Sequence, residues 1–174
     1  MLKGKRINLR ATERDDLPRY VKWFNDEEVN AHLTTFMPMN LDDETAWYEN
    51  QRQDSSMLTL AIVITAEDKH IGSIGLMHIK PRIQSAELGI SIGDKESWGQ
   101  GYGQEAIELL VDFGFMHLNL HRLFLRVDAN HPTAKRCYEK SGFVEEGRLR
   151  SAGFRHGQFF DQFIMSILRS EYKK

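Results

Sequence analysis

Alternating apolar and polar positions begin the chain and then give way to a helical spacing. Residues 6–12 place Ile7, Leu9 and Ala11 on one side, which predicts a half-buried strand. Beyond Thr12 the apolar residues return every three or four positions, which predicts a short helix. The apolar face of that helix consists of Leu17, Tyr20, Val21 and Phe24.

Two further helices are predicted before the next β-like pattern. Asn25-Asp26 favours the capping of a second short helix that continues through Val29 and Leu33. A third helix is predicted over residues 42–53, starting at Asp42 or Asp43 and carrying Trp47. After one strand, the N-terminal part of the chain is therefore expected to be mostly helical.

Three β-like runs follow at residues 57–65, 70–79 and 84–92. They are separated by polar turn sequences at residues 67–69 and 80–82, which predicts an antiparallel meander. A long helix is then predicted over residues 102–118. The remaining elements are a strand over 122–127, a helix over 132–140 that ends at Gly142, and strands over 143–150 and 158–168.

This order of elements predicts an α+β fold, with helices flanking one mixed, largely antiparallel sheet of about seven strands. A length of 174 residues suits a single domain over residues 1–174. The net charge of -2 gives no reason to expect a nucleic-acid partner. No apolar run reaches membrane-spanning length, and the one cysteine, Cys137, favours a reducing compartment. A cytoplasmic protein without a membrane partner or a bound metal is expected.

The most informative segment is Ser97–Ala106, which lies between a strand and the longest predicted helix. Its glycines at 99, 101 and 103 allow the backbone to approach a ligand closely, and the helix start favours an anion such as a phosphate. The spacing departs from the dinucleotide fingerprint, and the Gly-Lys-Ser/Thr ending of a nucleotide-triphosphate loop is absent. By itself the segment is also compatible with a plain strand-to-helix turn.

The chain resembles the GNAT superfamily of acetyltransferases at two motifs. Residues 98–103 resemble the family's cofactor loop, with Trp98 where Arg or Gln is usual. The run from Asn130 to Phe143 resembles the Asn-x-x-Ala-x-x-x-Tyr-x-x-x-Gly-Phe segment of the family. Trp98, together with residues 23–29 and Trp47-Tyr48, looks like the branch of ribosomal-protein N-terminal acetyltransferases (the RimJ/RimL type) and spermidine acetyltransferases.

The resemblance implies an enzyme that uses acetyl-CoA as the donor, with the strands at 84–92 and 122–127 splayed around the pantetheine arm. A backbone N–H near Leu88–Ile90 would polarise the thioester carbonyl, and Gly89 would mark a bulge or a close approach. The implied cofactor-binding residues are Leu88, Ile90, Ile92, Trp98, Gly99, Gln100, Gly101, Tyr102, Gly103, Gln104 and Asn130. For Asn130, capping of the helix near Pro132 is the other interpretation.

Acetyl transfer to an amine needs a proton donor for the leaving thiolate and a neutral amine. The resemblance places Tyr138 as the general acid, and Glu87 is the best candidate for the general base. His78 and bulk water are the alternatives to Glu87. Lys135 and Arg136 either reach the nucleotide phosphates or form a solvated helix face, and Cys137 is interpreted as a packing residue.

The expected acceptor is a primary amine, which leaves a protein N-terminus, a polyamine or a small amine metabolite such as an amino sugar. The carboxylates at 26–28 either attract a polyamine or cap a helix. Phe154, Phe159, Phe160 and Asp161 are candidates for the lining of the acceptor groove, and packing in the core or at an interface is the other interpretation of the aromatic pairs. A homodimer is possible, and a non-catalytic module that only binds acyl-CoA is the alternative to an enzyme.

Overall fold

The computed structural model describes residues 1–35 and 37–173, and it contains one eight-stranded sheet in the order β1-β2-β3-β4-β5-β6-β8-β7. The strands are β1 (Leu2–Lys3), β2 (Ile7–Ala11), β3 (Leu58–Ile64), β4 (Lys69–Lys80), β5 (Ser85–Ile92), β6 (Arg122–Asp128), β7 (Val144–Arg155) and β8 (Gln158–Leu168). The helices are α1 (Leu17–Phe24), α2 (Glu27–Asn30), α3 (Leu41–Gln53), α4 (Tyr102–Met116) and α5 (Pro132–Lys140).

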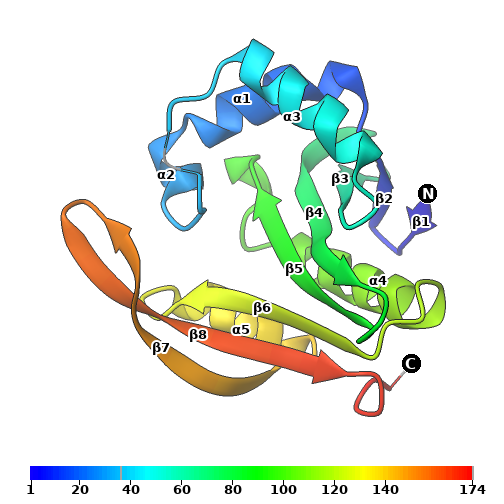
Figure 1. The fold of residues 1–174 in the computed structure, drawn as a ribbon. Coiled ribbons are helices and arrows are strands. Elements are labelled where there is room, and N and C mark those ends of the chain that lie inside the picture. Colours follow the sequence, from blue (N-terminus) through cyan, green and yellow to red (C-terminus); the bar gives the residue numbers. More distant parts are fainter. Residues whose placement is uncertain (36, 174) are drawn as a thin grey trace.

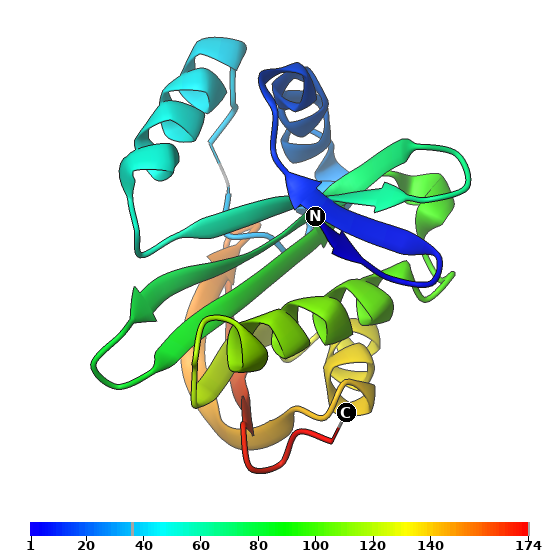
Figure 2. The same ribbon diagram turned by 90° about the vertical axis from the view of Figure 1, so that its right-hand side faces the viewer.

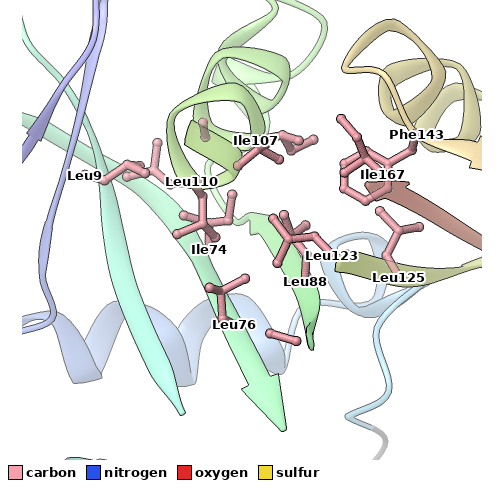
Figure 3. Packing of buried hydrophobic residues seen from close by; sticks show 14 of the residues in the cluster. Leu9, Ile74, Leu76, Leu88, Ile107, Leu110, Leu123, Leu125, Phe143 and Ile167 are labelled. Carbon is pink, nitrogen blue, oxygen red and sulfur yellow. The ribbon is translucent and has the colours of Figure 1, made fainter. Parts of the chain in front are cut away.

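Helices cover both faces of the sheet. Helices α1 and α3 lie on one face, and α4 and α5 lie on the other (Figures 1 and 2). The apolar stripe of α4 is buried against the sheet, where Leu110 meets Leu9, Ile74 and Leu123 in the main core (Figure 3). The α+β fold expected from the sequence is therefore confirmed, with β1 as a further two-residue strand.

Helix α1 is attached to the sheet by a buried carboxylate as well as by apolar packing. Asp16, just before α1, is 2% exposed and binds both terminal nitrogens of Arg10 at 2.6 and 2.8 Å. Its Oδ1 lies 3.0 Å from Nδ1 of His70 on β4. Because Tyr20 packs edge-on against the His70 ring, this polar cluster and the small apolar cluster of α1 and α3 support each other.

The sheet changes character between β5 and β6. All other neighbouring strands are antiparallel, but these two are parallel. Within the described part of the chain, they pair only where Ser85–Glu87 lie beside Arg122–Phe124. From Leu88 and Leu125 onward the strands diverge, so the expected splay is confirmed and backbone groups on the facing edges are unpaired.

Several element boundaries differ from the sequence-based predictions. Helix α3 starts at Leu41, one or two residues before the predicted start at Asp42 or Asp43, and its N-cap is Asn40, whose side chain accepts from the Asp43 amide. Helix α2 ends at Asn30, so the predicted continuation of this helix through Leu33 is wrong. Gly89 pairs in regular register with Gly75, so it forms no bulge; the irregularity lies between Met77 and Lys80. In the described residues, no helix combines the length and apolar character that a membrane crossing needs.

Candidate active site

The glycine-rich loop leads directly into α4. Gly99 and Gly101 adopt left-handed backbone angles, with φ of 72° and 83°, which glycine tolerates without strain. Gly101 is the residue that precedes the first turn of α4, where backbone N–H groups have no partner within the helix. The loop therefore presents backbone donors at the positive end of a helix dipole, an arrangement suited to a phosphate.

Arg6 braces this loop, a role that no motif or spacing predicted. Its Nη1 donates to the Gln100 carbonyl at 2.8 Å, its Nε lies 3.0 Å from Oε2 of Glu105, and its guanidinium lies over the Tyr102 ring. Burial alone would raise the pKa of Glu105, but hydrogen bonds from Arg6 and Ile7 outweigh it and lower that pKa. The segment that leads into β2 thus fixes the position of the N-terminus of α4.

A cavity of about 1630 Å³ opens where β5 and β6 diverge, bounded by the glycine-rich loop, α5, the α2 region and the β7–β8 hairpin. Most of the predicted site residues line it: Glu87, Leu88, Ile90, Ile92, Trp98, Gly99, Gly101, Tyr102, Gly103, Gln104 and Tyr138. Gln100 does not line it, because its side chain turns away to donate to the Glu96 carbonyl. Asn130 is exposed and also lies outside the lining. His131 occupies the N-cap of α5, so the capping interpretation of Asn130 is wrong.

Tyr138 lies on α5 and packs against the main core, with its ring edge-on to Phe143. Burial raises the pKa of its phenol, so the group stays protonated at neutral pH. No hydrogen bond to its hydroxyl is found among residues 1–35 and 37–173. A protonated hydroxyl without a protein partner is free to donate to a ligand in the cavity.

Glu87 lies on β5 with a side chain that is 16% exposed. Its Oε2 lies 3.3 Å from Nδ1 of His78, and its Oε1 lies 3.7 Å from Nε of Arg126. The His78 side chain is 69% exposed and does not line the cavity. Of these two sequence-based candidates for the base, only Glu87 reaches the site.

Two cations of α5 face the cavity. Arg136 and Lys140 line it, and neither has an ion-pair partner in the described part of the chain. Lys135 is instead held 2.6 Å from Oε1 of Glu139 and 3.2 Å from Oε2 of Glu145. Burial raises the pKa of the Cys137 thiol, which fits a packing residue better than a nucleophile.

The opposite side of the cavity contains a second polar group that the sequence analysis missed. Leu125 and Val127 of β6 point into the main core, so the alternation of a strand turns Arg126 and Asp128 to the other face. Asp128 is 6% exposed and binds side chains from the α2 region and the β7–β8 hairpin. One of these partners, His32, is 96 positions away in the sequence.

Only some of the residues predicted for the acceptor groove line the cavity. Phe154 and Phe160 line the cavity and Phe159 does not, while Asp161 is occupied by Arg148 at 2.7 Å and by the Ser151 amide. Among the carboxylates at 26–28, Asp26 caps α2. Lys95 lies 2.8 Å from Asp26 and 2.6 Å from Glu28, so these two carboxylates are already paired.

Comparison with known proteins gives consistent matches. A family model described as an acetyltransferase (GNAT) domain matches residues 6–144. The spermidine N(1)-acetyltransferase of Vibrio cholerae is 33% identical over 169 residues, covering 97% of this chain and 96% of that protein. The enzyme of the same name from Escherichia coli K12 is 30% identical, covering 95% and 88%. The crystal structure of the V. cholerae spermidine N-acetyltransferase in complex with CoA and spermine matches with a TM-score of 0.91 at 30% identity, covering 97% of this chain and 98% of that one.

Proposed function

Because the chain belongs to the GNAT acetyltransferase family and is an N-acetyltransferase, we propose that it acetylates a primary amine of a polyamine such as spermidine. The acceptor proposal is supported by the similarity to spermidine enzymes over nearly the whole length of the chain. The other two acceptors suggested by the sequence, a protein N-terminus and a small amine metabolite such as an amino sugar, receive no support from these relatives. We further propose that residues 1–174 act as one catalytic domain, in keeping with the continuous sheet.

The splay between β5 and β6 is the observation that carries the proposal, because its unpaired strand edges suit the amide groups of a pantetheine arm. The left-handed glycines 99 and 101 and the start of α4 suit the pyrophosphate, and Arg136 and Lys140 supply cations nearby. These features fit CoA. When bound, acetyl-CoA would supply the activated acetyl group as a thioester.

In the proposed mechanism, backbone N–H groups of β5 near Leu88–Ile90 hold and polarise the carbonyl oxygen. Tyr138 donates the proton that the departing CoA sulfur requires, and its raised pKa keeps that proton in place until the sulfur carries negative charge. On the other side of the sheet, a base must take a proton from the incoming ammonium. Glu87 remains the sequence-based prediction for that base.

The proposal is tested by measuring CoA thiol release from acetyl-CoA with a panel of amines: polyamines, N-terminal peptides, amino sugars and amino acids. Spermidine-dependent release is expected, and Tyr138→Phe should lower kcat about 100-fold, since general acid–base groups contribute about 10²–10⁴-fold. Tyr172→Phe is the matched control, because it also removes a phenolic hydroxyl but one bound to Asp112, outside the cavity lining. Calorimetry should show unchanged acetyl-CoA affinity in both variants.

The outcomes separate the alternatives. Release with peptides or amino sugars and none with polyamines would contradict the acceptor proposal and leave the transfer chemistry intact. Tight acetyl-CoA binding without release to any amine would instead favour a non-catalytic acyl-CoA-binding module. Failure to bind acetyl-CoA would contradict the assignment of the glycine-rich loop.

A further inference from the structure

Asp128, at the end of β6, joins three segments that are distant in the sequence. Its Oδ1 accepts from Nε2 of Gln162 on β8 at 3.1 Å, and its Oδ2 accepts from Nη1 of Arg155 on β7 at the same distance. Oδ2 also lies 3.2 Å from Nδ1 of His32, in the turn after α2. Arg155 completes the connection by donating to the Leu33 carbonyl at 2.7 Å. A buried carboxylate fixed by three partners is a rigid acceptor.

This geometry determines the proton position on His32. The Asp128 carboxylate can only accept, so the Nδ1 atom facing it must carry the proton. In the neutral ring the lone pair then lies on Nε2, which has no hydrogen-bond partner among the residues the structure describes. An aspartate that orients a histidine in this way is the arrangement that makes an imidazole an effective proton acceptor.

His32 is held in position but remains accessible. Its ring stacks on that of His131 with centroids 3.9 Å apart and planes 6° from parallel. Its side chain is 34% exposed, and both histidines line the cavity. The ring therefore has a fixed orientation with one face covered and its free nitrogen available.

His32 also lies on the side where a base is needed. Tyr138 packs against the main core on the α5 side, whereas Asp128 and its partners lie on the opposite face of β6. Glu87 lies on that opposite face too, but its two oxygens already approach His78 and Arg126. Nε2 of His32 is thus the better placed proton acceptor.

We propose that His32, oriented by Asp128, is the general base that takes a proton from the acceptor ammonium, directly or through a water molecule. The acceptor nitrogen then bonds to the acetyl carbon as the carbon–sulfur bond breaks. Of the three ammonium protons, one passes from Nε2 to solvent, one remains on the amide, and one replaces the proton that Tyr138 gives to the sulfur. This inference rests on the acetyl transfer proposed above.

The charged and titratable groups around the His32 ring come from three elements: Asp128 on β6, His131 at the start of α5, and Arg155 on β7. Burial, and then the neighbouring His32, lower the pKa of His131, so this stacking partner is neutral at neutral pH. Arg155 offsets part of the Asp128 charge. His32 therefore works beside one orienting carboxylate and without a competing imidazolium.

The test is the pH dependence of kcat/KM for the amine, from about pH 5.5 to about pH 11.5, a range that brackets imidazole and alkylammonium ionisation. His32→Gln should reduce kcat/KM about 100-fold near pH 7. The deficit should shrink above about pH 10 and disappear toward about pH 11.5, where most of the amine is neutral and needs no base. Acetyl-CoA affinity should not change. Asp128→Asn should show a smaller loss of kcat/KM with the same pH dependence. Added imidazole should partly restore the activity of His32→Ala.

His117→Gln, the same change at an exposed histidine after α4, is the control and should match the wild type at every pH. A His32→Gln deficit that is absent, or constant across the pH range, would overturn the proposal, as would the pH-dependent deficit appearing in Glu87→Gln instead. The assay uses whichever amine the wild type acetylates. A failure with spermidine alone therefore counts against the acceptor and not against His32.

Discussion

Replacing Gly101 by alanine tests the role of the glycine-rich loop. Gly101 has a φ of 83° and precedes the first turn of α4. An added Cβ would lie 3.2 Å from Nη2 of Arg6, the side chain that braces the loop. Gly103 is the matched position two residues further on: it is already helical, and an added Cβ would meet nothing nearer than 3.9 Å.

The two substitutions should have opposite effects on stability. The left-handed conformation costs a residue with a Cβ about 1–2 kcal/mol. Displacing Arg6, whose side chain is 51% exposed, adds at most about 1 kcal/mol because surface ion pairs contribute little. Gly101→Ala should therefore destabilise the protein by about 1–3 kcal/mol, which for a chain of this size lowers Tm by about 2–4 °C per kcal/mol. Gly103→Ala should be neutral or stabilise by up to about 1 kcal/mol through helix propensity.

Thermal unfolding followed by calorimetry, without ligand, measures both effects. Acetyl-CoA titration of the same samples should show about tenfold weaker binding for Gly101→Ala, since the strain shifts the backbone donors that face the phosphates. A Gly101→Ala protein that is as stable as the wild type would refute this account of the loop. So would a Gly103→Ala protein that loses more stability than the Gly101→Ala protein.

Two stability predictions concern buried carboxylates. Burial raises the pKa of Glu44 to about 7, and its Oε1 has no partner in the described part of the chain, so wild-type stability should fall as pH rises from about 4.5 to 7. Glu44→Gln should then be more stable than the wild type by about 3 kcal/mol at pH 8 and equal to it at pH 4, as measured by urea unfolding. For Asp16, burial raises the pKa, but hydrogen bonds from Arg10 and His70 outweigh it and hold the pKa well below its usual range, so its contribution is fully present above about pH 4 and declines gradually as the pH falls further toward that lowered pKa. Asp16→Asn should cost about 3–5 kcal/mol at pH 7 and progressively less below pH 4, and a cost that does not decrease between pH 5 and pH 2 would contradict the ionic origin of the effect.

Local periodicity was enough to predict most of the fold. The apolar spacing of α4 and the alternation of β5 and β6 reflect burial on one side, which a sequence records directly. β1 escaped prediction because two residues, Leu2 and Lys3, cannot show a period. The cap at Asn40 was missed because three consecutive acidic residues follow in the first turn of α3, and the sequence pattern does not show which residue of this polar run is the N-cap.

The site was predictable only where its residues are close together in the sequence. The loop at 98–104 forms one continuous motif, although Gln100 turns away because its amide finds the Glu96 carbonyl. The group around Asp128 joins His32 and Arg155, which come from different segments of the chain. No spacing rule links such residues, because strand order and the position of the β7–β8 hairpin bring them together.

The parallel contact between β5 and β6 also has a mechanical consequence. In the described structure, β1–β5 and β6–β8 form two halves of the sheet that share three residue pairs, with α4 and α5 touching across the boundary. Such a seam has few hydrogen bonds, so we expect the strand edges that face it to open more readily than the strands inside either half. Amide hydrogen exchange should therefore be faster along the facing edges of Leu88–Ile92 and Leu125–Asp128 than in β3 and β4. The least stiff line of the sheet runs through the place where the reacting groups must be aligned.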